Sequence, residues 1–451
     1  MEQWSGKTFE DIESEVWGIL IKTFQETMAE ILLELDKRIM ATRDMGRYEY
    51  KEKKEKTWIS RVGPVTIRRR YYWDAENEGW VFLLDEALGC TGKGSLSGGM
   101  KEMSVVWGTR GPSYRDAQER LKEMYGSQVI SHETIRQLVI QTSKRPAKEA
   151  EGPKREKPAA VYIEADGFWS KMQKGRRKES KLVVVHEGWE KRQGKEKRDY
   201  RLREAMYIST GDLKTGEDIW DRVHERLVER YGALGEVPVV INGDGAEWIR
   251  RGAEEFACGM YQMDRFHLKR EIRQIKDAGQ KQRALGSVNR NDPQALEKVL
   301  LEAAYRDPER AEKIMDLRKR ILMNPEAVRD YRVRLEEKGI AVTEQMRGMG
   351  AAESSVDRYK LRTGKRGRSW SKEGLTAILR LLGWMYEGTL TQRLRQHESA
   401  EAILPAGFAG QIAKRIGKGN LAVHPARFPA MERGTQGYAK TFRQLLQVEL
   451  T

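Results

Sequence analysis

Apolar residues recur at intervals of three and four positions between residues 8 and 40. Such spacing places side chains along one side of a helix. The positions concerned are Phe9, Ile12, Val16, Ile19, Leu20, Phe24, Met28, Ile31 and Leu35. We therefore predict one long amphipathic helix within an N-terminal helical segment, residues 1–56.

Two runs rich in β-branched and aromatic residues follow, at 57–62 and 65–73, on either side of Gly63-Pro64. This pattern predicts a hairpin that turns at Gly63-Pro64, in a small basic β-rich unit covering residues 57–100. Arginines alternate with aromatic residues in the second run, which would suit a surface that follows a phosphate backbone. An edge hairpin protected by its charge from further pairing explains the same pattern.

Residues 101–148 read as a series of short helices. Ser113 begins a capping-box pattern for a helix that ends near Tyr125, Gly126 makes a turn, and Ser131 can cap a second helix. Helix, glycine turn and helix form the outline of a helix-turn-helix, a DNA-binding motif, although ordinary helical hairpins share it. The candidate DNA contacts are Arg115, Thr134, Arg136 and Gln137.

Beyond a charged, proline-containing linker at residues 149–160, short apolar runs predict strands. They lie at 161–165, 181–186, 205–208, 237–241 and 259–263, and helical patterns follow the third, fourth and fifth. The order β-β-β-α-β-α-β-α is the ribonuclease H-like layout. We predict an α/β ribonuclease H-like catalytic core with a helical insertion, preceded by a mainly helical N-terminal DNA-binding region. Its parts are 161–277 (core, first part), 278–345 (helical insertion), 346–388 (core completion) and 389–451 (C-terminal basic helical region).

Two aspartates stand at the ends of predicted strands, each beside a glycine: Asp166 and Asp244. A carboxylate just past a strand projects into the crevice where α/β sheets bind ligands. Two carboxylates about 4 Å apart repel by roughly 1 to 4 kcal/mol, and a divalent cation removes that cost. Oxygen ligands with few histidines favour Mg²⁺ or Mn²⁺, and two such ions can promote phosphodiester chemistry. The alternative is that both aspartates merely cap backbone amides.

A third acid would complete such a site. Glu353 opens a helical pattern just after the insertion and is our candidate, with Asp357, one turn later, as the fallback. A basic cluster follows, which we interpret as a phosphate-tracking patch, with a solvated helix face as the alternative. Its members are Arg358, Lys360, Arg362, Lys365, Arg366 and Arg368.

Composition narrows the class of protein. The 451 residues include 83 Lys and Arg against 68 Asp and Glu, a net charge of +15, and a pI near 9.5. Such a balance favours nucleic acid as partner, although a ribosome-associated or simply basic protein would share it. Two distant cysteines, Cys90 and Cys258, make a disulfide framework or a zinc ribbon improbable. With no apolar run long enough for a bilayer and no signal-peptide pattern, we expect no membrane association and a cytoplasmic protein, nucleoid-associated when bound to DNA.

Three strings together resemble a known family: Tyr162–Gly167, Ile241–Ile249 and Met263–Leu268. They are similar to bacterial insertion-sequence transposases of the ISLre2 group, also known as UPF0236 proteins, which resemble Mutator-type DDE transposases. Leu83–Glu86, the helix that begins at Ser113–Arg115, and Ser369–Ser371 extend the resemblance over most of the chain.

The resemblance implies that Asp166, Asp244 and Glu353 are catalytic and bind the metal, two Mg²⁺ or Mn²⁺ ions. Asp264 and His267 match a Cys/Asp-x-x-His motif and would support the site, although His267 could equally be a buried structural histidine. Glu164, on the strand face of Asp166, could be a second supporting acid or a solvated neighbour.

The implied activity is DNA cleavage at the ends of an insertion sequence, followed by attack of the freed 3′-hydroxyl on target DNA. The implied partners are double-stranded DNA, as terminal inverted repeats and as target, and further copies of the chain, because two ends must be brought together. Two alternatives remain: a ribonuclease H-like nuclease or resolvase without strand transfer, and a domesticated DNA-binding protein that has lost catalysis.

Overall fold

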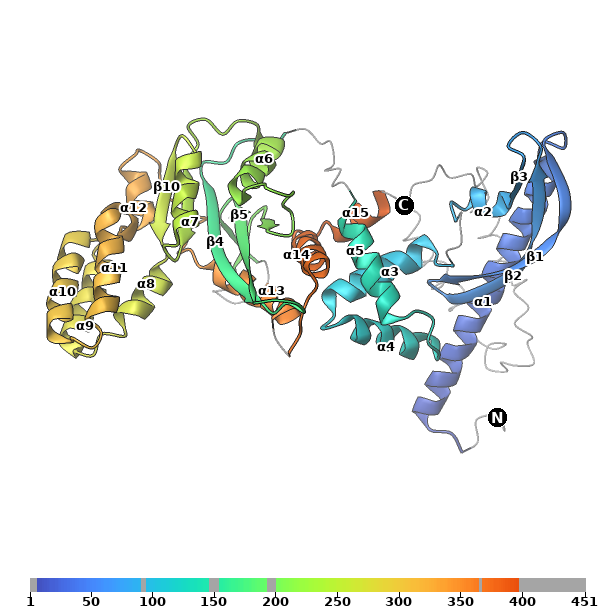
Figure 1. Ribbon diagram of the computed structural model, residues 1–451, viewed down its shortest axis with the longest axis horizontal. Coiled ribbons are helices and arrows are strands. Elements are labelled where there is room, and N and C mark those ends of the chain that lie inside the picture. Colours follow the sequence, from blue (N-terminus) through green and yellow to red (C-terminus); the bar gives the residue numbers. More distant parts are fainter. Residues whose placement is uncertain (1–5, 91–94, 146–153, 193–199, 365–366, 397–451) are drawn as a thin grey trace. The chain divides into compact units, whose positions relative to one another are not determined.

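The computed structural model describes residues 6–90, 95–145, 154–192, 200–364 and 367–396. These fall into two compact units, coloured along the sequence in Figure 1. Of these described residues, the first unit contains those within 6–108, 114–138 and 394–396, and the second contains those within 109–113 and 139–393. Among the helices of these ranges, none offers an apolar stretch sufficient to cross a bilayer.

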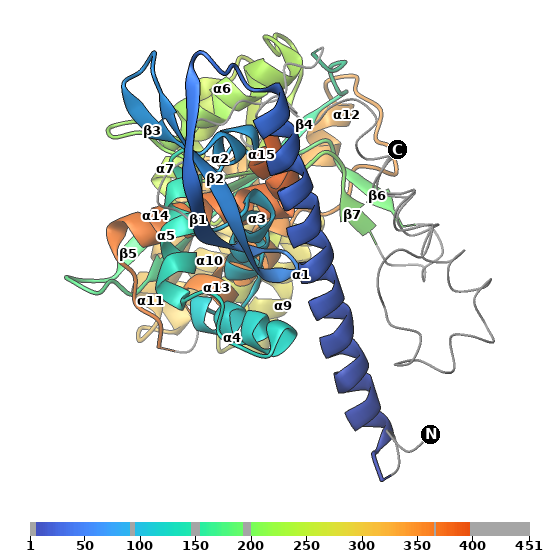
Figure 2. The ribbon, with the colours of Figure 1, turned by 90° about the vertical axis from the view of Figure 1, so that its right-hand side faces the viewer.

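The first unit begins with the predicted long helix, α1 (Phe9–Thr42), whose start is capped by Thr8 and Asp11 in a reciprocal capping box. A hairpin of β1 (Tyr48–Ser60) and β2 (Gly63–Asp74) packs beside it, with β3 (Gly79–Val81) paired to β2 (Figure 2). Leu35, Trp58 and Ile67 form the core between helix and hairpin.

Two details of the predicted hairpin are wrong. Its first strand begins nine residues earlier than predicted, at Tyr48, so the segment 1–56 is helical only as far as Thr42. Residues 49–56 are nearly all charged, and a strand without apolar alternation gives no sequence signal. The turn lies at Arg61-Val62, while Gly63 (φ 92°) and Pro64 already belong to β2, where they pair with Ser60 and Ile59.

Two of the three arginines of β2 are held by buried acids, whereas Arg68 is exposed. Arg69 is 4% exposed and forms two hydrogen bonds with Asp85, at 2.5 and 2.9 Å, from the short helix α2 (Leu83–Ala87). Arg70 pairs with the fully buried Asp36 of α1 at 2.5 Å. Both guanidinium groups therefore join the hairpin to its helices, which favours the structural interpretation of this arginine-rich strand over a phosphate surface.

Three helices follow: α3 (Gly98–Arg110), α4 (Tyr114–Tyr125) and α5 (His132–Ser143). The last two have the predicted glycine turn between them, where Gly126 has a φ of 70°. Ser131 accepts a hydrogen bond from the Thr134 amide at 3.1 Å, as its position before α5 predicts. Met100, Leu121 and Ile135, one from each helix, meet in a common core.

The second unit is built on a five-stranded mixed sheet in the order β10-β9-β4-β5-β8. The strands are β4 (Val161–Ser170), β5 (Lys178–His186), β8 (Met206–Ser209), β9 (Val239–Gly243) and β10 (Gly259–Met263). Along the chain, the first three pair antiparallel, and the last two add parallel to the other side of β4. A separate ribbon pairs β6 (Trp189–Lys191) with β7 (Tyr200–Leu202).

Helices connect and cover the strands. Those of the first half are α6 (Ile219–Tyr231), α7 (Glu247–Arg251), the 3-10 turn η2 (Gly252–Glu255) and α8 (Arg265–Ile272). The predicted helical insertion contains α9 (Ala278–Asn289), α10 (Pro293–Arg306), α11 (Ala311–Met323), η3 (Pro325–Val328) and α12 (Tyr331–Glu336). Its apolar residues share one core with the sheet, as Leu296 and Ile321 do with Ile163.

After the insertion come α13 (Ala351–Thr363), α14 (Lys372–Tyr386) and α15 (Leu390–Gln396). Helix α13 packs on β4 and β5. The predicted C-terminal basic helical region, 389–451, is described only as far as α15, and its remainder lies outside the described residues. Residues 154–159 of the predicted linker form neither helix nor strand, and 149–153 also lie outside.

Candidate functional site

Strand register brings the two predicted aspartates to the same level of the sheet. Glu164 of β4 lies opposite Asn242 of the parallel strand β9, so Asp166 and Asp244, two residues further on in each case, are neighbours. Met263 of β10 lies opposite Gly243, which puts Asp264 beside Asp244. Asp244 and Asp264 thus directly follow the carboxyl ends of β9 and β10. Asp166, which we predicted at a strand end, lies instead within β4, which continues to Ser170, at the same level of the sheet.

Asp166 occupies a half-buried position beside a like charge. Burial raises its pKa, and the negative charge of Asp244 raises it further. The Gly167 amide, which donates to Oδ1 at 2.7 Å, and the charges of His267 and Lys360 oppose this rise. A carboxylate that is costly to ionise is one that a cation would stabilise.

Asp244 begins the turn into α7. Its Oδ1 accepts a hydrogen bond from the Ala246 amide at 3.0 Å, and Gly245 between them has a φ of 100°, which favours glycine. Each aspartate therefore caps a backbone amide, as the structural alternative expected. Only one oxygen is used in each case, and in the part of the chain that the structure describes the second oxygens of Asp166 and Asp244 receive no hydrogen bond.

Asp264 and His267 form a tightly held pair. Asp264 is 5% exposed, and its carboxylate accepts from the His267 amide and from Asn242 Nδ2, both at 2.8 Å. Burial alone would raise the pKa of Asp264, but the hydrogen bonds from His267 and Asn242 outweigh it and lower the pKa. The His267 Nδ1 lies 3.1 Å from Asp264 Oδ1, and this contact raises the pKa of the histidine. Asp264 thus caps α8, while His267 places its ring near Asp166.

Glu164 has a role that the sequence did not reveal. It is fully buried, and its Oε2 accepts from the Ala351 and Ala352 amides at 2.7 and 3.3 Å. Its other oxygen lies 3.4 Å from His186 Nε2. The carboxylate therefore caps the start of α13 and ties this helix to β4, two residues before Asp166.

Glu353, the predicted third acid, lies in the first turn of α13. Within the described ranges, no three Asp, Glu, His or Cys side chains gather closely enough to hold a metal ion. Asp166, Asp244 and Glu353 are therefore not grouped around a common point. The residue of α13 whose charge acts on Asp166 is Lys360, which lowers the pKa of that carboxyl.

Among the described members of the predicted phosphate-tracking patch, not all face solvent. Arg362 is 5% exposed, and its guanidinium lies 5.1 Å from the centre of the Trp370 ring. Arg368 donates to the carbonyl oxygens of Leu361 and Arg362 at 2.6 and 3.1 Å, near the end of α13. The burial of Arg362 corrects the prediction for that residue, whereas Arg368 remains partly exposed. Arg358 is exposed, whereas Lys365 and Arg366 lie outside the described residues.

The candidate DNA contacts of α4 and α5 are only partly free to bind. Arg136 forms two hydrogen bonds with Glu133, at 2.9 and 2.7 Å, and Gln137 donates to the same carboxylate at 3.0 Å. The Arg136 side chain lowers the pKa of Glu133 to about 2. Thr134 contacts Ser131, whereas Arg115 is exposed on α4.

Two further residues support the aspartates. Arg320 of α11 donates through Nη1 to the backbone oxygen of Asp244 at 3.1 Å and pairs with Glu271. The Tyr261 hydroxyl donates to the Gly243 oxygen at 3.1 Å, and burial together with the charge of Asp244 raises the pKa of that tyrosine. The sequence gives no signal for Arg320, which is 76 residues from Asp244 within the insertion.

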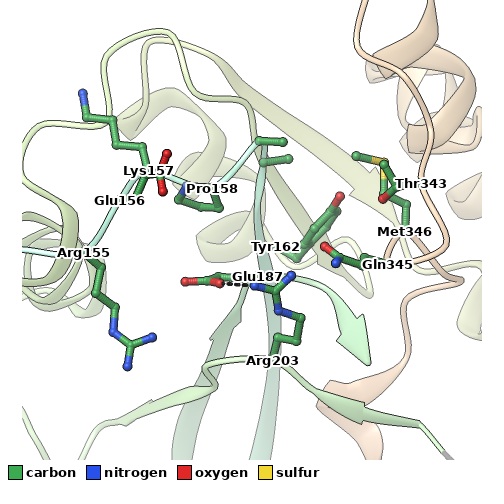
Figure 3. Close-up of a pocket in the computed structure, with 12 residues that line it drawn as sticks. Arg155, Glu156, Lys157, Pro158, Tyr162, Glu187, Arg203, Thr343, Gln345 and Met346 are labelled. Carbon is green, nitrogen blue, oxygen red and sulfur yellow. Dashed lines mark hydrogen bonds and ion pairs between the residues drawn. The ribbon is translucent and has the colours of Figure 1, made fainter. Parts of the chain in front are cut away.

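A cavity of about 410 Å³ lies at the opposite end of β4, near Ala160 and Tyr162 (Figure 3). Its charges are largely paired: Glu187 binds Arg203 at 3.2 Å and accepts from the Tyr231 hydroxyl at 2.8 Å. It lies away from the strand ends that carry the aspartates, and we assign it no part in the site.

Fold and site together define an α/β protein in which Asp244, just past the end of β9, lies beside Asp166 of the adjacent strand β4. The chain belongs to the uncharacterised protein family UPF0236, whose model matches residues 3–400. A UPF0236 protein of Caldanaerobacter subterraneus subsp. tengcongensis is 26% identical over 83% of this chain and 78% of its own length. A UPF0236 protein from the vanSb 3′ region of Streptococcus gallolyticus is 26% identical over 84% and 83%, respectively.

Another relative from the same Caldanaerobacter strain, 24% identical over 84% of this chain and 78% of its own, has a name that combines eleven designations. Among solved structures, the Drosophila P element transposase strand transfer complex aligns with 75% of this chain and 90% of its own. That alignment has 10% sequence identity and a TM-score of 0.23.

Proposed function

We propose that this protein is a DDE-type transposase of the ISLre2 group, which cleaves DNA at the ends of an insertion sequence and joins them to target DNA. The sheet supports a ribonuclease H-like core, because three antiparallel strands are followed by two strands that add parallel to the first. The observation that carries the proposal is the register that makes Asp166 and Asp244 neighbours at one sheet edge.

The carboxylates of Asp166 and Asp244 provide part of what is needed to bind a divalent cation. Asp166 and Asp244 offer hard oxygen ligands, and each has one oxygen without a donor among the described residues. They would hold Mg²⁺ or Mn²⁺, which in such sites polarises the scissile phosphodiester. Glu353 would be the third ligand, and the proposal requires its side chain to approach the two aspartates when DNA binds.

The remaining residues would set the geometry for that step. Glu164 holds the start of α13 against β4, so a movement of Glu353 is confined to its own side chain and turn. Lys360 and His267 both favour the charged form of Asp166, and Lys360 brings positive charge toward the place where phosphate would also lie. Tyr261 and Arg320 hold the backbone on either side of the Asp244 turn.

The relatives give one independent line of support. A name that combines eleven designations in one strain agrees with a sequence carried in many copies, which is how a mobile element behaves. On this proposal, the DNA partners are terminal inverted repeats and target duplex, and the protein assembles as a homo-oligomer on DNA.

The test uses a supercoiled plasmid that carries the DNA found on both sides of the gene, incubated with full-length protein and Mg²⁺ or Mn²⁺. We expect cleavage at the element ends and joined products. Asp244→Asn should abolish both while end binding, measured by gel shift, stays within about twofold, since a phosphate surface does not need this carboxylate. Glu247→Gln, an exposed acid on α7, is the matched control. Near-normal joining by Asp244→Asn would refute the proposal.

A second candidate is a DNA-binding protein that has lost catalysis, and the ungrouped third acid favours it. It predicts gel shifts without cleavage under any metal condition. A ribonuclease H-like nuclease or resolvase would cleave and yet give no joined product in the same assay.

A further inference from the structure

A second feature of the α/β unit is a basic cavity of about 720 Å³ among α8, α9, α10 and α11, helices that Figure 1 shows packed together beside β10. Its lining contains six basic side chains and two acidic ones, Glu271 and Asp316. The basic ones are Arg273, Lys276, Lys281, Arg310, Lys313 and Arg320. Positive charge therefore exceeds negative charge around one concave surface.

Half of these basic side chains have neither an ion pair nor a hydrogen bond among the described residues. Lys276 pairs with Glu309 at 2.6 Å, Arg320 with Glu271, and Arg310 donates to the Gln274 carbonyl. By contrast, Arg273, Lys281 and Lys313 form no ion pair within the ranges that the structure describes. Three cations around one cavity repel one another, and a bound anion would turn that repulsion into attraction.

The floor of the cavity is apolar and firmly packed. Ile275, Leu300, Ile314 and Leu317 line it and are each less than 10% exposed. They belong to the core that the insertion shares with the sheet. The basic side chains are thus attached to well-packed helices. The volume of the cavity exceeds that of a single phosphate ion.

One side chain links the cavity to the candidate site. Arg320 lines the cavity, and its Nη1 donates to the backbone oxygen of Asp244 at 3.1 Å. Gly245 lies so close that a Cβ on it would be 3.3 Å from the same Nη1. An anion bound in the cavity would therefore lie next to the strand end that carries Asp244.

We propose that this cavity binds backbone phosphates of a nucleic-acid strand that runs past Asp244, with Arg273, Lys281 and Lys313 as the contacts. The inference rests on the proposed function for the nature of the strand. Free phosphate or a nucleotide presents the same chemical group, but the excess volume and the contact of Arg320 with Asp244 favour a polymer backbone.

The test compares two charge reversals on the same helix. Lys313→Glu changes a cavity lysine, and Lys319→Glu changes an exposed lysine of α11 outside the lining, with the same change in net charge. Binding of full-length protein to a labelled 30-base-pair duplex is measured by fluorescence anisotropy in EDTA, so that no cleavage interferes. Loss of one phosphate contact should weaken binding about fivefold at 0.15 M salt and make the log–log salt slope shallower by about 0.9. Lys319→Glu should change the affinity less than about twofold.

Equal effects of the two reversals would overturn the inference and leave the proposed function standing. If Lys313→Glu weakens the binding of inorganic phosphate in calorimetry but not that of the duplex, the cavity serves a free anion and the inference also fails. If Lys313→Glu weakens duplex binding but the wild-type protein cleaves no DNA, the inference stands and the proposed function fails. If the wild-type protein binds no duplex, both fail.

Discussion

At the scale of single residues, Asp166 is the group whose environment most clearly favours a cation. Burial and the neighbouring charge of Asp244 both penalise its ionised form. Because its pKa is raised in the folded chain, this group stabilises the fold relative to the unfolded chain only at low pH, and that contribution is lost as pH rises through the folded pKa. A residue kept at a cost to stability is typical of a functional position.

Metal binding at Asp166 should depend on pH, because the pKa of this carboxyl is raised. Mn²⁺ must displace the proton of Asp166, so its affinity for full-length protein should increase as pH rises through a value above the ordinary 3.8 and then level off. Isothermal titration calorimetry over a series of pH values measures this. Asp166→Asn should bind Mn²⁺ at least about tenfold more weakly, since one of two charged ligands is lost. A pH-independent affinity equal in both proteins would contradict a metal site at Asp166 and Asp244.

Asp166→Asn should also reveal the cost of the carboxylate in the absence of metal. The variant should gain free energy of unfolding relative to the wild type at neutral pH, and the gain should shrink as pH falls through the raised folded pKa and vanish below the unfolded pKa. Urea denaturation in EDTA at several pH values checks this. A variant that is less stable than the wild type at neutral pH would show that the carboxylate serves mainly as a backbone cap.

At the scale of elements, the strands could be predicted from sequence, because apolar runs such as Val239–Ile241 give a strong local signal. The end of β4 could not, because this strand continues past Asp166 to Ser170. The contacts between residues far apart in the sequence could not be predicted. Arg320 and Glu164 act on backbone groups 76 and 187 residues away, respectively, and no local pattern encodes such pairs. The burial of Arg362 was equally hidden, because a basic run looks the same whether it faces water or Trp370.

Glu164 allows a direct test of how α13 is held. Glu164→Ala would leave the Ala351 and Ala352 amides without their acceptor in a buried place, which should lower the free energy of unfolding by about 3 kcal/mol. Glu164→Gln keeps an acceptor oxygen and should lose less. The exposed Glu179→Ala of β5 should stay within about 0.5 kcal/mol of the wild type in the same urea titrations. If all three variants are equally stable, Glu164 does not anchor the helix.

Gly243 sets the approach of α7 to the end of β9. A Cβ at this position would lie 2.6 Å from Ile249 Cγ2 and 3.1 Å from the Ala165 oxygen. Gly243→Ala should therefore lower the free energy of unfolding by about 1 to 3 kcal/mol and displace the Asp244 turn. Gly348→Ala, whose Cβ would meet nothing within 4 Å, is the control. Thermal denaturation of both variants decides the matter, and matching melting temperatures would show that the packing at Gly243 is loose.

At the scale of the whole molecule, a net charge of +15 is a statement about partners and not about fold. In the folded chain, some of the basic side chains are bound to other residues and others remain available. Arg69 and Arg70 pair with buried acids, and Arg362 packs against an aromatic ring. By contrast, Arg273 and Lys313 line a cavity and form no ion pair in the described ranges. The sequence predicts the total, but only the fold shows which cations remain available to a polyanion.

The basic side chains that remain available should make DNA binding depend on salt concentration. If the protein contacts six to ten phosphates, its affinity for a duplex of arbitrary sequence should fall by about 10³ to 10⁵ between 50 and 200 mM salt, linearly on a log–log plot, because each contact releases counterions. Fluorescence anisotropy over a salt series measures the slope. Asp244→Asn should keep the same slope, since this carboxylate lies at the chemistry and not on a phosphate surface. An affinity that does not change with salt would mean that the net charge serves solubility, and would remove DNA from the partners of this chain.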